Sequence, residues 1–281
     1  VRGTWQQNAP LYASYSYKKM KTIYIHIGLH KTGSTSIQKY LNNNSDNFKC
    51  YIPKKGRIEI KNTINHGNIA WEILGDSRFN QKQGCLKDLL KEIENKKKIF
   101  LSSEDFELVL SNLELKMFFE NCLKDFKIYY IAFIRNTEDH LASLIHELTT
   151  HMHQNKKLIL YRFPKYIYQY LTKGYIINNL YETKVKSYFF INHKVLIRNF
   201  KKNSRGKFLF FEYDKKNILE EFDKLNFLIE KNKNNLNIYK NTKKGKIKFI
   251  IQKLIKKKII YIKKDRNLKL INIINKSLNN F

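Results

Sequence analysis

KTIYIHIGLHKTGSTSIQKYL, residues 21–41, carries the strongest structural signal in the chain. Residues 23–27 are apolar and mostly β-branched, which predicts a buried parallel strand. A glycine-bearing link follows over residues 28–33, and apolar side chains at helical spacing then predict a helix that starts near Ser34. The first turn of such a helix presents unpaired N–H groups and the positive end of its dipole, and glycines let the backbone approach an oxyanion. The stretch therefore predicts a binding site for a phosphate-like group.

The position of Lys31 in this loop narrows the choice of anion. A Walker A loop places its lysine after the second glycine, directly before Ser or Thr. Here Lys31 precedes Gly33, in the order Lys-Thr-Gly-Ser-Thr. This order argues against a P-loop-type nucleotide or small-molecule kinase, an alternative that would require ATP affinity and an acidic metal ligand. Lys31 adds a point charge to the site, and the hydroxyls of Ser34, Thr35 and Ser36 add donors.

A second candidate contact to an anion lies near Arg135. This contact and the one at Lys31 are called the two anion grips below. Residues 127–135 form another apolar run, and this one ends in arginine. Asn136 and Thr137 can cap a helix, and Ser143 follows Arg135 by eight residues. A guanidinium can hold two phosphate oxygens at once, and a hydroxyl supplies a further donor. An arginine and a serine alone would be unremarkable, and it is the family resemblance described below that makes a second phosphate contact the better interpretation.

A candidate general base follows the second predicted strand of the chain. Residues 98–101 are apolar and are followed by polar residues 102–105, which include Glu104. The carboxyl ends of the strands form the edge where open α/β sheets bind ligands. Glu104, His66 and His30 are the candidates for a base, and the family resemblance described below implies that Glu104 is the best of them. Each has a structural alternative: Glu104 as a first-turn carboxylate, His66 as a packing histidine, and His30 as a residue that shapes the loop.

Residues 20–213 resemble the bacterial sulfotransferases that use 3′-phosphoadenosine 5′-phosphosulfate (PAPS). The specific pair of motifs is HIGLHKTGSTSIQ and YYIAFIRNTEDHLASLIHEL, and softer matches are NHGNIAWEILGDSRF and IFLSSEDF. Residues 195–200 and 208–213 look like the last strands of that family. The resemblance implies a three-layer α/β/α fold with a central parallel sheet, P-loop-NTPase-like and related to nucleotide kinases. Alternation of strands and helices along the chain favours the same fold class.

The resemblance also implies a reaction, the in-line transfer of a sulfuryl group from PAPS to an acceptor hydroxyl or amine. The expected acceptor is a carbohydrate or a surface-glycan precursor, and no metal is expected. Lys31 would neutralise charge on the bridging oxygen, and Glu104, His66 or His30 would take the acceptor proton. The residues expected to bind the cosubstrate are His30, Lys31, Thr32, Gly33, Ser34, Thr35 and Ser36 at its 5′ end, and Arg135 and Ser143 at its 3′-phosphate.

Composition sets broad limits on the alternatives. The 281 residues are 42% hydrophobic and 14% aromatic, which is typical of a globular protein. A formal charge of +30 leaves open a basic protein that binds nucleic acid or anionic surfaces, although zinc-finger spacing and RNA-binding aromatic motifs are missing. The scattered Cys50, Cys85 and Cys122 look like reduced thiols, which favours a cytoplasmic location.

The chain divides into three parts by composition. Residues 1–19 lack periodicity and are expected to be a disordered leader or an added extension, and residues 20–235 are expected to form the sulfotransferase domain. Residues 236–281 are predicted to be a basic helical extension. Within it, residues 247–264 form an amphipathic helix that could lie on the inner surface of a membrane or dock on its own domain.

Overall fold

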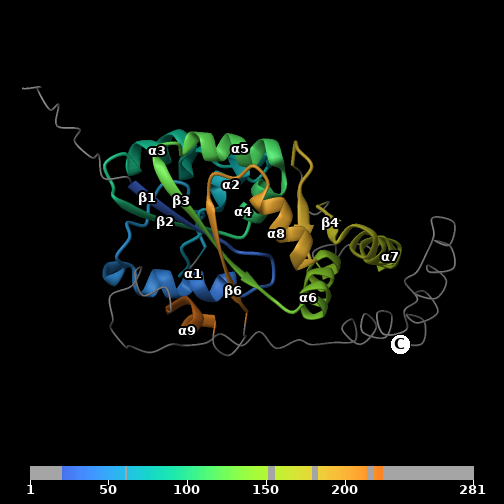
Figure 1. Cartoon of the computed structure of the whole chain (residues 1–281). Helices are drawn as coiled ribbons and strands as arrows, with labels where there is room; N and C mark the ends of the chain where they lie inside the picture. The colour runs from blue at the N-terminus through green and yellow to red at the C-terminus, as the bar shows by residue number, and fades with distance from the viewer. Residues whose placement is uncertain (1–20, 61, 151–155, 179–182, 214–217, 224–281) are drawn as a thin grey trace, which may run out of the picture.

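The computed structural model describes residues 21–60, 62–150, 156–178, 183–213 and 218–223. Its centre is a parallel sheet of four strands in the order β2-β1-β3-β6 (Figure 1). The strands of this sheet are β1 (Lys21–Ile27), β2 (Lys98–Ser103), β3 (Phe126–Ile134) and β6 (Lys207–Glu212). A separate antiparallel pair, β4 (Tyr175–Ile177) and β5 (Tyr188–Phe190), was not expected from the sequence.

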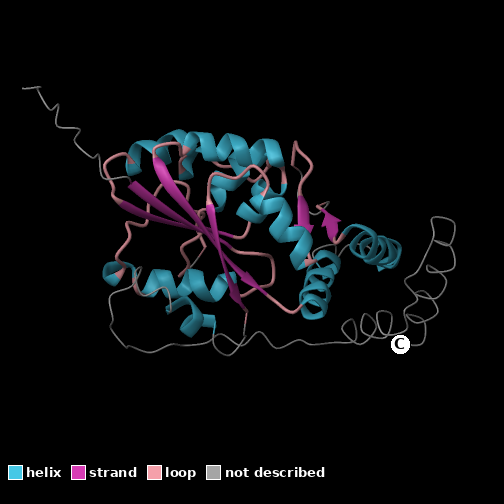
Figure 2. Cartoon of the chain, in the orientation of Figure 1, coloured by secondary structure: helices cyan, strands magenta, loops and turns pink. Residues whose placement is uncertain are grey.

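Helices lie on both faces of the sheet, as Figure 2 shows, an arrangement compatible with three α/β/α layers. In Figure 1, α3 and α5 cover one face, and α1 and α9 lie on the other. The helices are α1 (Ser34–Asn43), α2 (Gly67–Leu74), α3 (Leu86–Ile93), α4 (Phe106–Ser111), α5 (Leu113–Cys122), α6 (Thr137–Thr150), α7 (Lys156–Lys173), α8 (His193–Lys201) and α9 (Ile218–Asp223). Two short 3₁₀ turns are η1 (Ser45–Asn47) and η2 (Gln81–Gln83).

The central strands are apolar because both of their faces are buried. In β1, Ile23, Ile25 and Ile27 belong to the core beneath α2 to α5. The intervening Tyr24 packs on the opposite side, in the core that contains Ile37 of α1 and further side chains of α9. A strand covered on both faces reads as a nearly continuous apolar run, which is why the sequence identified it.

Besides the unexpected β4–β5 pair, one predicted element has a different type in the structure. Residues 195–200 were expected to form a strand, but they lie within α8. The Asn192 side chain caps this helix, and Leu196 and Phe200 are buried at helical spacing. A short apolar run fits a strand or a buried helix equally well, so periodicity could not separate the two. The strands expected over residues 23–27, 98–101, 127–135 and 208–213 are confirmed within one or two residues at each end.

Several predictions concern parts of the chain outside the described residues. These are the leader over residues 1–19, the end of the domain over residues 224–235, the extension over residues 236–281 and its amphipathic segment 247–264. Among the helices of the described ranges, none combines the length and apolar character that a membrane crossing requires.

The strand order places a topological switch point between β1 and β3. From β1 the chain passes to β2 on one side, and the following strand β3 pairs with β1 on the other side. The order of the strands therefore reverses at this point, and ligands of open α/β sheets bind there, outside the carboxyl ends of the strands. Residues 28–33 leave β1 at this edge, and Arg135 follows β3. The topology thus brings together the two anion grips predicted from the sequence.

Candidate functional site

The loop over residues 28–33 has the backbone of a tight cradle. Lys31 and Gly33 adopt left-handed conformations, with φ of 67° and 83°. The Thr32 hydroxyl donates to the Leu29 carbonyl over 2.6 Å and closes the turn. Gly33 precedes α1, which has no side-chain cap and no acidic residue in its first turn. The Ser36 N–H donates to the Gly33 carbonyl over 2.9 Å, so among the described residues the N–H groups of Ser34 and Thr35 are the ones left to water or to an anion.

Ser34 is the most enclosed hydroxyl at the start of α1. Its side-chain oxygen is buried and has no hydrogen-bond partner among the described residues. A Cβ atom added to Gly28 would lie 2.3 Å from this oxygen, so the glycine allows the close approach. Thr35 is exposed and Ser36 is half-buried. A buried hydroxyl without a hydrogen-bond partner costs free energy. Of the three hydroxyls, that of Ser34 would therefore gain most from a hydrogen bond to a ligand.

Arg135 reaches the glycine loop directly. Its Nη1 donates to the Lys31 carbonyl over 2.8 Å, and its guanidinium lies 5.2 Å from the centre of the Tyr213 ring. His193, at the start of α8, holds the Arg135 carbonyl through Nε2 at 2.7 Å. The sequence pointed to Arg135 but not to His193, because nothing in the local pattern links α8 to the end of β3. The two predicted grips therefore lie in one site.

Ser143 lies on the face of α6 that also carries Glu147, the ion-pair partner of Lys31. The Lys31 Nζ forms an ion pair with Glu147 Oε1 at 3.1 Å. Glu147 lies four residues after Ser143 in α6, and residues at this spacing share a helix face. Ser143 is half-buried. Ser143 therefore lies on the face of α6 that Lys31 contacts. Glu147, which the sequence did not indicate, is a further residue of the site.

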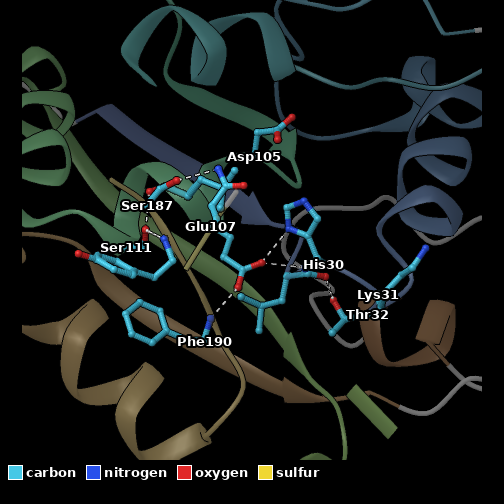
Figure 3. Close-up of polar contacts among 12 residues, drawn as sticks. His30, Lys31, Thr32, Asp105, Glu107, Ser111, Ser187 and Phe190 are labelled. Atoms are coloured by element: carbon cyan, nitrogen blue, oxygen red, sulfur yellow. Dashed lines mark hydrogen bonds and ion pairs between the residues drawn. The ribbon is translucent and has the colours of Figure 1, made fainter. Parts of the chain in front are cut away.

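His30 forms a buried ion pair beneath the loop. Its backbone N–H and its Nδ1 both donate to Glu107 Oε2 over 2.9 Å, as Figure 3 shows. The other Glu107 oxygen accepts from the Phe190 N–H of β5 over 3.2 Å, and His140 Nε2 donates to the His30 carbonyl over 2.8 Å. The imidazole is buried and faces Glu107, while the Lys31 side chain in Figure 3 points away from this pair. The geometry gives His30 the loop-shaping role, with Glu107 and His140 as partners that the sequence did not reveal.

The protonation of His30 is set by two opposing effects. Burial lowers the pKa of the imidazole, and the hydrogen bond and charge of Glu107, with the charges of Glu104 and Asp105, raise that pKa to about 9. His30 is therefore a cation at neutral pH, and its positive charge is compensated by Glu107.

Glu104 lies next to this loop at the end of β2. A Cβ atom on Gly28 would lie 3.2 Å from the Glu104 Cα, so the two backbones approach closely. Burial raises the pKa of the half-buried carboxyl to about 7. His30 and Lys31 act in the lowering direction, and Glu147 and Asp105 in the raising direction. A pKa near neutrality is suited to a general base, and together with its place beside the loop it keeps Glu104 as the leading candidate.

His66 lies outside this constellation. Its ring is fully buried, Nε2 donates to the Pro53 carbonyl over 3.0 Å, and Nδ1 accepts from the Ser102 N–H over 3.2 Å. Burial lowers the pKa of His66 to about 4, so the ring is neutral. Both ring nitrogens already have backbone partners, which is the packing role named as its alternative. We therefore leave His66 out of the catalytic set proposed below.

The comparisons with known proteins contribute no identification. No protein-family model, no curated protein and no solved structure matches this chain.

Proposed function

We propose that this protein is a PAPS-dependent sulfotransferase with the P-loop-like fold of that family. Its acceptor would be a hydroxyl or amine, with a carbohydrate or surface-glycan precursor as the expected class. The observation that carries the proposal is the contact between Arg135 Nη1 and the Lys31 carbonyl. A ligand with phosphate groups at two positions could occupy both grips at once. Adenosine 3′,5′-bisphosphate is such a ligand.

In this proposal, the loop and α1 hold the 5′ end of PAPS. The uncapped first turn of α1 and the Ser34 hydroxyl supply donors, and Lys31 supplies charge. Arg135 uses Nη1 for the Lys31 carbonyl, and the other N–H groups of its guanidinium can bind the 3′-phosphate together with Ser143. Thr32 and Gly33 contribute the backbone geometry of the cradle.

The transfer step needs a base and a stabilised leaving group. The acceptor oxygen attacks the sulfur, its proton passes to Glu104, and the bond from sulfur to the bridging oxygen breaks. Adenosine 3′,5′-bisphosphate leaves, and Lys31 neutralises the charge that develops on the oxygen of its 5′-phosphate. Positioning of the two substrates and electrostatic stabilisation carry such a reaction, as in phosphoryl transfer.

Calorimetric titration at moderate salt tests the cosubstrate. Adenosine 3′,5′-bisphosphate should bind, and Lys31→Ala and Arg135→Ala should each weaken binding by about 10- to 100-fold, the value of a charged hydrogen bond. Arg198→Ala removes an exposed arginine of α8 and serves as the matched control. Full affinity in the Arg135 variant, or no binding by the wild type, would contradict the proposal.

The same titration separates the alternatives. Binding of ATP with Mg²⁺ but not of the bisphosphate would favour the kinase, and salt-sensitive binding of an oligonucleotide alone would favour the basic binding protein. Sulfation assays over a panel of sugars, lipids and phenols, with PAPS as donor, would then identify the acceptor class.

A further inference from the structure

Glu147 is an unexpected residue to find beside an anion cradle. Its carboxylate contacts Lys31 Nζ at 3.1 Å, and the two side chains are 13% and 34% exposed. A fixed negative charge next to a bound phosphate or sulfate repels it, so Glu147 opposes the function that the loop serves. Glu147 therefore needs an explanation beyond helix packing.

The cationic groups of the loop are matched by acidic neighbours. Lys31 faces Glu147, and His30 faces Glu107. Glu104 also lies within the electrostatic reach of both cations and of Glu147. The positive charges of Lys31 and His30 are therefore each compensated before an anion binds, although the whole chain carries a formal charge of +30.

The two acidic partners differ in access to solvent. The His30–Glu107 pair is closed, with side chains only 3% and 1% exposed, and Glu107 is also held by the Phe190 N–H. The Lys31–Glu147 pair is partly open, and lysine is a long, flexible side chain that can rotate away from its partner. Only this second pair can exchange its carboxylate for an arriving anion without rebuilding the core.

We propose that Glu147 is a positioning residue that holds Lys31 against α6 while the site is empty, and that the anion must displace it. The inference rests on the proposed function in that it takes the loop to be an anion site. A partly exposed ion pair such as Lys31–Glu147 favours the paired state by about two- to fivefold. A charged contact between Lys31 and a polyanion is stronger than this, so the anion can displace Glu147. The ion pair thereby keeps Lys31 ordered and close to the anion site, and it lowers the affinity for the anion only modestly.

A first experiment examines Lys31 without any ligand. The full-length chain is treated with a limiting amount of an amine-acylating reagent in a buffer free of phosphate and sulfate, and acylation of Lys31 is quantified by mass spectrometry. Glu147→Gln should increase Lys31 acylation about threefold, because the ammonium loses its partner. Glu114→Gln removes an exposed carboxylate of α5 and should leave Lys31 unchanged. Equal acylation in wild type and Glu147→Gln would overturn the inference.

A second experiment measures the competition itself, by calorimetry with inorganic pyrophosphate and with adenosine 3′,5′-bisphosphate. Glu147→Gln should bind both anions about three- to tenfold more tightly than the wild type. In a Lys31→Ala background the same change should give a smaller gain, since only the repulsion by the carboxylate remains. A gain of equal size in that background would show that Glu147 acts by charge alone, and would overturn the positioning role.

Glu147→Asp separates contact from charge. Aspartate keeps the negative charge but has a shorter side chain, so Lys31 acylation should rise toward the value of Glu147→Gln. Wild-type acylation in this variant would contradict a direct contact. Failure of every variant to bind either anion would overturn the proposed function together with this inference. Equal binding by wild type and Glu147→Gln would overturn the inference alone.

Discussion

Burial lowers the pKa of every histidine in the core, and acidic neighbours, Glu107 above all, reverse the outcome for His30. Burial lowers the pKa of His26 and of His140 to about 3, since desolvation disfavours the charged imidazole. His30 is buried as completely, but Glu107 accepts from its Nδ1 and holds the proton on the ring. Histidine is thus neutral at positions 26 and 140 and cationic at position 30 within the glycine loop, according to its partners.

Burial also shifts the pKa of Glu104, and its role as general base can be tested by substitution. Glu104→Gln keeps the size of the side chain and removes the carboxylate, so sulfuryl transfer should fall about 10²- to 10⁴-fold while the bisphosphate still binds. The base acts in its ionised form and its pKa is raised to about 7, so the wild-type rate should rise with pH up to about 7. Transfer rates measured from pH 5.5 to 8.5 in both proteins check this.

The variant should lack that rise with pH. A Glu104→Gln protein that transfers sulfate at the wild-type rate would show that the residue is only a carboxylate at the start of a helical turn. His30 would then be the remaining candidate base, although its ion pair with Glu107 argues against it.

At the scale of single elements, α8 links the site to the rest of the fold. Its first residue, His193, holds the Arg135 carbonyl, and its Leu196 and Phe200 are buried in the core. Its last turn is tied down by Lys116, whose Nζ donates to the Asn199 and Phe200 carbonyls over 3.0 Å each. The orientation of Arg135 therefore depends on how α8 begins.

The cap of α8 provides the next prediction. The Asn192 side-chain oxygen accepts from the Lys194 N–H over 3.0 Å and from the Val195 N–H over 3.3 Å. Asn192→Ala should lower the free energy of unfolding by about 1 kcal/mol, because the first turn loses its cap. Urea denaturation measures this loss. Asn192→Asp, which can cap equally well, should stay near the wild type, and equal losses in both variants would show that the cap contributes nothing specific.

Some elements of this protein could be predicted from the sequence and others could not. β1 and α1 were predicted from local pattern alone, since both the apolar run and the uncapped helix start are encoded within residues 21–41. The strand predicted at residues 195–200 was wrong because its apolar run is too short for periodicity to decide, although Asn192 was a visible cap signal. Glu107 and Glu147 could not be predicted, because their contacts join α4 and α6 to a loop that is distant in the chain.

For the whole molecule, the protonation of buried groups determines how stability depends on pH. His26, His66 and His140 have pKa values lowered to between about 3 and 4, so they contribute stability that is present above pH 6.5 and is lost as the pH falls. Glu104, with its pKa raised to about 7, acts in the opposite sense between pH 4.5 and 7. Three groups outweigh one, so stability should decline toward acid.

The alkaline side is governed by His30. Its pKa is raised from 6.5 to about 9, so its contribution is fully present below pH 6.5 and is lost as the pH rises through 9. Stability should therefore be greatest near pH 6.5 and fall above it, by at most ~1.4 kcal/mol per pH unit for one proton. Urea denaturation of the full chain at intervals from pH 4.5 to 9.5 gives this profile.

Two variants assign the alkaline decline to the buried pair. Glu107→Gln removes the charge that raises the pKa of His30, so the variant should be less stable at pH 6.5 and nearly flat from there to pH 9. His30→Gln should be flat in the same range for the same reason, whereas His146→Gln, at an exposed position of α6, should keep the wild-type slope. A decline that persists in both variants of the pair would mean that His30 is not a buried cation, and the compensated charge beneath the anion loop would have to be abandoned.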